Sequence, residues 1–288
     1  MIEFAEIQTL NALVYSMLLF ILALGLSLTF GLLRVVNLAH GSFFMFGSYI
    51  AITIWNYTGS FVLSAIGAAV IVGVIGALLE RLWLRHFYTR GPLDQVILTF
   101  GFALVMIDVA KMLWGKDILS LAAPALLSGS VEIADTSFPQ YRLFLIAVGL
   151  VLFLCTWLAI ERTQIGALIR ATVSDRFMVG GLGFDVFGLF TVSFGFGAAL
   201  AGLGGALGAP LLGAYPGLDF DVLITTLIVV VVGGLGNITG AFWSSLLIGF
   251  SETYGKALIP QLASFIIFMV MATALLVRSL RLPDEEAD

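Results

Sequence analysis

Residues 222–251 read VLITTLIVVVVGGLGNITGAFWSSLLIGFS and contain no formally charged side chain. A helix that crosses a bilayer needs about 20 mostly apolar residues, so this stretch is longer than one span requires. Glycines interrupt it at the centre, from Gly233 to Gly240. We predict two short helices or a re-entrant pair, joined at these glycines. A hydrophobic segment broken by glycine is a sequence indication of a transport pathway.

The composition of the whole chain agrees with residence in a membrane. Of its 288 residues 60% are hydrophobic and 11% are charged, and the mean hydropathy is +1.11. Soluble domains carry about 25% charged residues. The composition therefore excludes a soluble enzyme, a nucleic-acid-binding protein and a disordered chain, and makes membrane lipid the expected surroundings. Further charge-free stretches predict the remaining spans: 7–33, 35–79 (two spans, broken near 56–59), 95–107 (extended to 114), 143–160, 186–218 and 257–277.

We therefore predict an all-α polytopic membrane protein, folded as a single transmembrane domain over residues 1–288. It should have about 8 or 9 transmembrane helices, including the broken C-terminal element. The arginines that follow predicted spans form three groups: Arg81, Arg85 and Arg90; Arg162, Arg170 and Arg176; and Arg278 and Arg281.

These arginines predict the orientation of the chain, because basic side chains favour the cytoplasmic side. Counting spans from them places the N-terminus and the segment 115–140 outside, and Arg34 and the C-terminus in the cytoplasm. The tail reaches the cytoplasm only if residues 222–251 cross the membrane an even number of times. The arginines thus support a broken element at that position.

The cytoplasmic segment 161–187 contains the pattern of a short amphipathic helix outside the bilayer. Ile165, Leu168 and Ile169 fall on one face at helical spacing, and glycines at 180–183 end the helix. One interpretation is a solvated, positively charged loop. The other is a rigid helix that docks into a partner protein. A helix this short needs packing from a neighbour to be stable, which favours docking.

Small residues recur every four positions at Gly197, Ala201 and Gly205. Such a row lets another helix approach closely. We predict that these residues pack helices together rather than contact a substrate.

The residue patterns of common enzymes are missing from the sequence. It contains no GxxxxGK[ST] phosphate-binding loop, no HExxH motif and no GxSxG nucleophile motif, and its only histidines are His40 and His86. We predict no catalytic residue, no metal site and no cofactor bound by this chain. A transporter of this sequence needs its energy from another protein.

Three blocks of sequence resemble LivH-type permeases, the branched-chain amino acid subfamily of ABC importers. The first is GLSLTFGLLRVVNLAHGSFFMFGSY at 25–49, and the second is RTQIG at 162–166 with Arg170, Ala171 and Asp175. The third is VVGGLGNITGAFW at 231–243. Together the blocks extend over almost the whole chain.

The resemblance implies a permease subunit that works by alternating access. The expected cargo is an amino acid of the branched-chain type or a related small polar, amide or carboxylate solute. The implied partners are a LivM-like second permease, two ATP-binding subunits that hold ATP and Mg, and a periplasmic substrate-binding protein. The implied location is the cytoplasmic (inner) membrane of a bacterium or archaeon. By resemblance, five residues of the 161–187 loop couple the permease to an ATPase: Arg162, Thr163, Gly166, Arg170 and Asp175.

Asn37 and Asn237 each lie beside glycines at a predicted helix break. An amide there either caps freed backbone groups or meets a polar substrate, and capping is the favoured interpretation. With Gly41, Gly236 and Gly240 they form our candidate translocation pathway.

Other polar residues are predicted at the membrane surfaces. We expect His40 just inside the cytoplasmic face, and an ion pair between Asp108 and Lys111 near the outer end of the fourth span. Asp219 and Asp221 should lie on the outer side, where they contact a binding protein or cap the next helix.

The blocks 37–43 and 237–242 share Asn, Gly and Phe, which indicates an internal repeat or a coincidence in a glycine-rich chain. Two other functions remain open from the residues. One is a stand-alone channel or facilitator for a small polar solute such as urea, and the other is a membrane scaffold that transports nothing.

Overall fold

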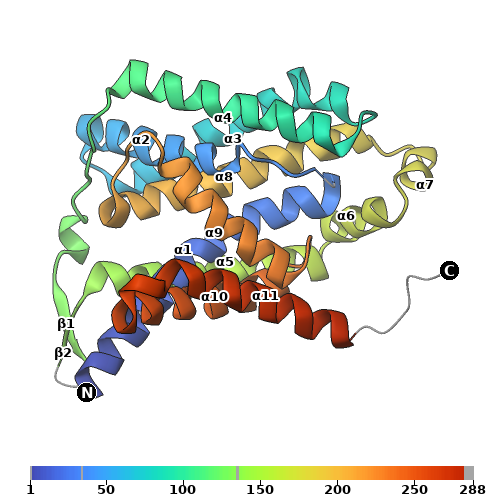
Figure 1. Cartoon of the computed structure of the whole chain (residues 1–288). Helices are drawn as coiled ribbons and strands as arrows, with labels where there is room; N and C mark the ends of the chain where they lie inside the picture. The colour runs from blue at the N-terminus through green and yellow to red at the C-terminus, as the bar shows by residue number, and fades with distance from the viewer. Residues whose placement is uncertain (1, 34, 134–135, 282–288) are drawn as a thin grey trace.

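The structure, a computed structural model, describes residues 2–33, 35–133 and 136–281. It is a bundle of long helices with short helices at one end and a β-hairpin at the other (Figure 1). The helices are α1 (Ile2–Leu33), α2 (His40–Thr58), α3 (Phe61–Leu82), α4 (Pro92–Trp114), α5 (Gln140–Arg162), α6 (Gln164–Ser174), α7 (Arg176–Gly181), α8 (Val186–Leu212), α9 (Leu218–Gly233), α10 (Ile238–Leu258) and α11 (Ala263–Arg281). The hairpin pairs β1 (Ser130–Ile133) with β2 (Thr136–Pro139), and 3-10 turns occupy Leu84–Phe87 (η1), Ala125–Leu127 (η2) and Pro260–Leu262 (η3).

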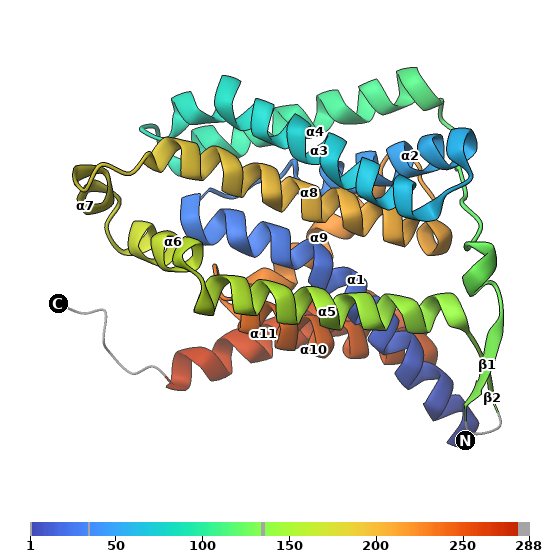
Figure 2. The same ribbon diagram turned by 180° about the vertical axis from the view of Figure 1, so that it is seen from behind.

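Five helices, α1, α3, α4, α5 and α8, are long and apolar enough to cross a membrane. The chain is therefore a multi-pass membrane protein of the all-α class, as the composition predicts. The start of α1 and the hairpin lie at one end of the bundle, which we call the hairpin end (Figures 1 and 2). At the opposite end, the α6–α7 end, lie α6, α7 and the last turns of α3, α5 and α11. Arg34 and the side chains of Arg278 and Arg281 lie outside the described residues.

The predicted break within residues 222–251 is confirmed. Helices α9 and α10 are joined by the segment Gly234–Asn237. Gly234 and Gly236 have backbone φ angles of +91° and +79°, which residues other than glycine rarely adopt. A Cβ added to Gly240 would overlap the carbonyl oxygen of Gly233, so the two helices pack closely at the turn. In the chain, α9 and α10 follow α8 and precede α11. The last turns of α11 lie at the α6–α7 end (Figure 1).

The helix α2 begins inside the bundle and not at its surface. The His40 Nε2 lies 3.0 Å from the carbonyl oxygen of Leu22, and Gly25 also packs on the imidazole. Leu22 precedes the end of α1 by eleven residues, or about 16 Å of helix. His40 is fully buried, so the prediction of a place at the cytoplasmic face is wrong. The chain turns back into the bundle after α1 before it resumes a helix.

The helices α1–α4 and α8–α11 pack in matching patterns, and α1 and α8 run in opposite directions between the two ends of the bundle (Figures 1 and 2). In one half α2 and α3 pack on α8, and in the other half α9 and α10 pack on α1. By these contacts α2 corresponds to α9, and α3 corresponds to α10. Like α2, α9 begins inside the bundle, after the segment 213–217. Inverted repeats of this kind are common in transporters.

This arrangement corrects the predicted repeat of 37–43 with 237–242. The counterpart of α2 is α9, and α10, which begins at Ile238, corresponds to α3. Each block holds backbone at or near a helix start, and the two helices that follow differ in their packing partners.

Helix α8 runs through the centre of the bundle and carries the predicted row of small residues. A Cβ on Gly197 would lie 2.6 Å from the Thr29 Cγ2 atom of α1, and one on Gly205 would overlap the Phe44 carbonyl oxygen of α2. Ala201 between them is fully buried. The row therefore faces α1 and α2, where backbones approach each other most closely.

The predicted ion pair of α4 is confirmed. The Lys111 Nζ lies 3.0 Å from an Asp108 carboxylate oxygen, and both side chains are exposed near the hairpin end. The nearby Trp114 indole donates to the Thr53 hydroxyl at 2.8 Å, which fixes the end of α4 on α2.

Candidate functional site

Three regions of the structure bring together polar or unusually exposed side chains. They are the short helices α6 and α7, the point where the first turns of α2 and α9 meet, and a cavity at the hairpin end. Among the described residues, no group of three or more His, Cys, Asp or Glu could hold a metal ion.

The turn from α5 into α6 is rigid because of Thr163 and Gly166. The Thr163 hydroxyl caps α6 by accepting the Gly166 N–H at 3.2 Å, and it also donates to the Ala159 carbonyl at 2.5 Å. A Cβ on Gly166 would overlap the Ile160 carbonyl oxygen, so only glycine fits this approach. Arg170 donates from one turn further to the same Ile160 carbonyl. Three of the predicted coupling residues, Thr163, Gly166 and Arg170, thus hold α6 at a fixed angle to α5, and a fourth, Arg162, is exposed in the last turn of α5.

The predicted helix within 161–187 is in fact two helices, separated at Asp175. One Asp175 carboxylate oxygen accepts the N–H groups of Phe177 and Met178, each at 2.9 Å, and so begins α7. Aspartate is favoured at the start of a helix because its side chain accepts hydrogen bonds from the first free N–H groups. The sequence pattern predicted one helix because the residues on both sides of Asp175 are helical.

Apolar side chains on α6, α7 and the following turn are exposed. Phe177 is 79% exposed and Met178 is 63% exposed. We call this region the α6–α7 surface, and its exposed apolar residues are Ile165, Val173, Phe177, Met178, Leu182 and Phe184. Large apolar side chains exposed together indicate a surface that another protein or a membrane covers.

A buried carboxylate supports the bundle below this surface. Both Glu80 oxygens accept hydrogen bonds, from the Tyr88 hydroxyl at 2.6 Å and the Thr191 hydroxyl at 2.5 Å. Burial and the hydrogen bond to Glu80 raise the pKa of Tyr88, so this hydroxyl remains a neutral donor. Glu80 thereby joins the end of α3 to η1 and α8. The sequence offered one signal, a single acid at the end of an apolar span.

The second region is the α2–α9 junction, which we define by Ser42, Asp219, His40 and Gly41. The Ser42 hydroxyl donates to an Asp219 carboxylate oxygen at 2.9 Å, and a Cβ on Gly41 would overlap the Asp219 carbonyl oxygen. Asp219 is only 1% exposed. Of the two alternatives for Asp219, burial excludes contact with a binding protein, and its place in the first turn of α9 agrees with a role at the start of that helix, whereas Asp221 is exposed.

The position of the Asp219 carboxylate has a clear electrostatic reason. It lies where two helices begin, and the first turn of a helix carries partial positive charge and free N–H groups. Its second oxygen has no hydrogen-bond partner among the described residues. The two halves of the protein thus meet at a buried acidic side chain, beside the buried polar side chain of Ser42.

The predicted pathway residues fall into two separate groups. Asn37 and Gly41 lie beside or within the α2–α9 junction, whereas Gly236, Asn237 and Gly240 form the turn between α9 and α10, where Gly236 packs on Gly31 of α1. Both amides bind backbone: the Asn37 oxygen accepts the Ala39 N–H at 3.1 Å and the Asn237 oxygen accepts the Gly240 N–H at 2.9 Å. Asn237 is thus the cap of α10, whereas Asn37 holds the turn that precedes α2.

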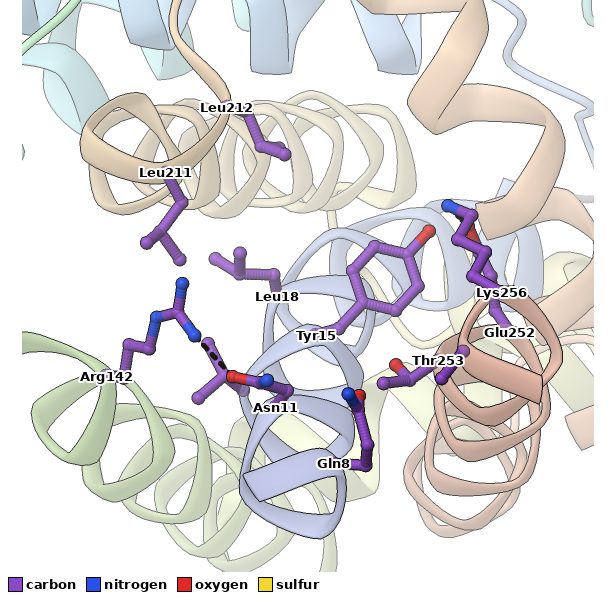
Figure 3. A pocket seen from close by; sticks show the side chains of 12 residues that line it. Gln8, Asn11, Tyr15, Leu18, Arg142, Leu211, Leu212, Glu252, Thr253 and Lys256 are labelled. Carbon is purple, nitrogen blue, oxygen red and sulfur yellow. Dashed lines mark hydrogen bonds and ion pairs between the residues drawn. The ribbon is translucent and has the colours of Figure 1, made fainter. Parts of the chain in front are cut away.

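The third region is a cavity of about 430 Å³ at the hairpin end, between α1, α5, α8 and α10 (Figure 3). We call it the vestibule. Arg142 donates to the Asn11 side-chain oxygen on one wall, and Lys256 pairs with Glu252 at 2.5 Å on the other. A neighbouring cavity of about 440 Å³ shares Tyr15, Glu252 and Lys256 with it. This region was not predicted from the sequence, in which Arg142, Glu252 and Lys256 only flank the predicted spans.

Comparison with known proteins agrees with this architecture. The sequence profile of the family described as "Branched-chain amino acid transport system / permease component" matches residues 8–275. The permease protein BraD of the high-affinity branched-chain amino acid transport system of Pseudomonas aeruginosa is 31% identical over 86% of this chain and 85% of its own length. The permease protein LivH of the corresponding Escherichia coli system is 25% identical over 90% of this chain and 91% of its own.

An archaeal relative is similar over much the same region. The probable branched-chain amino acid transport permease protein LivH of Methanocaldococcus jannaschii is 27% identical over 84% of this chain and 78% of its own. No solved structure matches the chain. The family profile covers most of the chain, from the first turns of α1 to α11. This chain therefore belongs to the branched-chain amino acid transport permease family.

Proposed function

We propose that this chain is one permease subunit of an ATP-driven importer of branched-chain amino acids. Its relatives are described as permease proteins of branched-chain amino acid transport systems, and its fold has the oppositely directed halves and broken helices that suit alternating access. A second permease, two ATP-binding subunits and a substrate-binding protein complete the transporter. ATP and Mg bind to the partner subunits, and this chain supplies part of the pathway.

The α6–α7 surface carries this proposal. The ATP-binding subunit covers Phe177 and its neighbours, and the rigid turn at Gly166 transmits movement of that subunit to α5. Arg162, Arg170 and Asp175 lie on the same segment, and Arg170 also lies 3.8 Å from Glu161. Because the segment is fixed to α5 by backbone contacts, a displacement of α6 moves the span with it.

The arginines support an orientation with the α6–α7 end in the cytoplasm. Of the arginines whose side chains the structure describes, Arg142 alone lies at the hairpin end. The others lie at the ends of spans or in short elements of the α6–α7 end: Arg81, Arg85, Arg90, Arg162, Arg170 and Arg176. Positive charge concentrates on the cytoplasmic side of membrane proteins. The start of α1 and the hairpin then face outward, toward the substrate-binding protein.

The test replaces Phe177 by Glu in the complete transporter, purified through a tag on this chain. We expect the ATP-binding subunits to be lost from the purified complex and ATP-dependent leucine uptake to fall with them. The matched control is Leu126→Glu, which adds the same charge to an exposed apolar site on η2 at the hairpin end. Unchanged association in Phe177→Glu would refute docking at this surface. Solute flux through this chain alone, without ATP-binding subunits, would instead support a stand-alone channel.

A further inference from the structure

The vestibule has charged groups of opposite sign on facing walls. Figure 3 shows Arg142 on one side and Glu252 with Lys256 on the other, with Tyr15 and Leu18 between them. The Arg142 guanidinium is oriented by its hydrogen bond to Asn11, and Phe138 packs against it at 5.9 Å from the ring centre. The ion pairs among the described residues do not include Arg142. This wall can therefore accept a carboxylate in the two-pronged geometry that arginine favours.

The opposite wall holds a carboxylate whose cation can be exchanged. The Glu252 side chain is 8% exposed, whereas its partner Lys256 is 63% exposed. A buried carboxylate requires a cation close by, but a long and flexible lysine side chain can yield its place to another ammonium group. Glu252 is thus poised to bind an incoming ammonium while Lys256 moves to the solvent or to an incoming carboxylate.

The surfaces between the charged walls are aliphatic. They are contributed by α1 and α8, from the residues Val14, Leu18, Leu211 and Leu212. A cavity volume of about 430 Å³ lies within the range of roughly 300–1,000 Å³ that is typical of small-molecule sites. The cavity therefore offers a cation, an anion and an apolar wall within one small space.

We propose that the vestibule is a binding site of this permease for a zwitterionic α-amino acid with an aliphatic side chain. Arg142 binds the α-carboxylate, with Asn11 as its positioning residue. The α-ammonium replaces Lys256 on Glu252, and the aliphatic side chain packs on Leu18, Leu211 and Leu212. The exchange leaves neither the buried carboxylate nor the substrate ammonium unpaired. The inference rests on the proposed function and adds to it a selective site within the membrane subunit itself.

Photo-leucine, the diazirine analogue of leucine, tests the site directly. The complete transporter is placed in lipid nanodiscs without the substrate-binding protein, irradiated with the probe, and digested for mass spectrometry. We expect labelled peptides that contain Leu18, Leu211 or Leu212, and competition by excess leucine. Leucinamide lacks the carboxylate and 4-methylpentanoate lacks the ammonium. Each should compete about tenfold less well, because it lacks one of the two charged groups that the site binds.

Variants locate the two charged walls. Arg142→Gln and Glu252→Gln should each lower labelling about tenfold, and Arg142→Lys should recover part of it. The matched control is Lys111→Gln, which removes an exposed cation at the same end but outside the cavity, and it should label as the unaltered transporter does. Size-exclusion chromatography checks folding, and a variant that misfolds is replaced by Asn11→Ala, which leaves the guanidinium in place but without its positioning partner.

Two outcomes overturn the site: labelling confined to other peptides, or labelling that Arg142→Gln and Glu252→Gln leave unchanged. The proposed function is judged separately, by ATP-dependent leucine uptake of the unaltered transporter with its binding protein. Uptake without labelling of the vestibule would refute the site alone. A transporter that imports no amino acid would refute the proposed function.

Discussion

The α2–α9 junction and the α6–α7 surface depart from the usual distribution of side chains in opposite ways. The junction buries the carboxylate of Asp219 in an apolar core, and the α6–α7 surface exposes Phe177 and Met178. A buried charge persists only where helix ends and hydrogen bonds stabilise it. An exposed apolar cluster persists where a partner covers it. The first region therefore determines whether this chain folds, and the second determines what it binds.

The largest effect should follow from adding a side chain at the junction. Gly41→Leu would drive a Cβ into the Asp219 carbonyl oxygen, and backbone cannot yield as a flexible side chain does. Overpacking of this kind costs about 1–3 kcal/mol or more. We expect little folded protein in the membrane, measured by fluorescence-detected size-exclusion chromatography of a tagged chain.

A glycine in open space provides the control for this substitution. Nothing lies within 4 Å of a Cβ added to Gly101 in α4. Gly101→Ala should leave the yield of folded protein unchanged or raise it, because alanine favours helices. Equal yields from Gly41→Leu and Gly101→Ala would show that the halves are not packed as described.

Removal of the buried carboxylate should have the next largest effect. Asp219→Ala leaves the Ser42 hydroxyl without its acceptor and two helix starts without an anion. We expect a loss of about 1–3 kcal/mol, visible as a lower Tm of the purified complex, with Asp219→Asn in between. Asp221→Ala, at an exposed position on the same helix, should change the Tm much less. A Tm of Asp219→Ala at or above that of the unaltered protein would contradict a stabilising junction.

The turn between α9 and α10 should show a smaller effect. Asn237→Ala removes the side chain that accepts the Gly240 N–H, and loss of such a cap costs about 1 kcal/mol. Asn237→Asp retains an acceptor and should restore most of the Tm. If alanine and aspartate behave alike, the side chain at this turn acts in some way other than as a cap.

The smallest effect on stability, but a clear one on coupling, is expected at the α6–α7 surface. Asp175→Ala removes the cap of α7, a short and exposed helix on which few other contacts depend. The Tm should change little, while leucine-stimulated ATP hydrolysis should fall. Asp175→Asn should restore hydrolysis because asparagine caps a helix equally well. A large drop in Tm with ATP hydrolysis intact would show that the α6–α7 surface stabilises the fold and does not couple the subunits.

Much of the fold followed from local patterns. Charge-free stretches predicted the spans, the glycines at 233–240 predicted the break between α9 and α10, and the residues near 56–59 predicted the end of α2. Each of these features depends on neighbours in sequence, as hydropathy and glycine geometry do. Thr163 and Gly166 were singled out by resemblance to the permease family, although their contacts with α5 were not predicted.

Patterns of neighbouring residues in the sequence could not predict that α2 and α9 begin inside the bundle. Placing His40 requires that Leu22 of α1 lie beside it, and placing Asp219 requires Ser42, which is 177 residues away. A histidine or aspartate next to glycine is equally consistent with a membrane surface. The vestibule was missed for the same reason, because Arg142 and Glu252 are isolated charges on different helices.

The sequence by itself determined that the chain is a multi-pass membrane protein and that its C-terminal hydrophobic stretch is broken at the glycines. These properties depend on the transfer of side chains between water and lipid, which is nearly additive along the chain. Only the tertiary structure decided which ionisable side chains are buried, how the two halves pack on each other, and that opposite charges face one cavity. Those properties depend on the close approach of backbones at positions such as Gly41 and Gly205, between residues that the sequence places far apart.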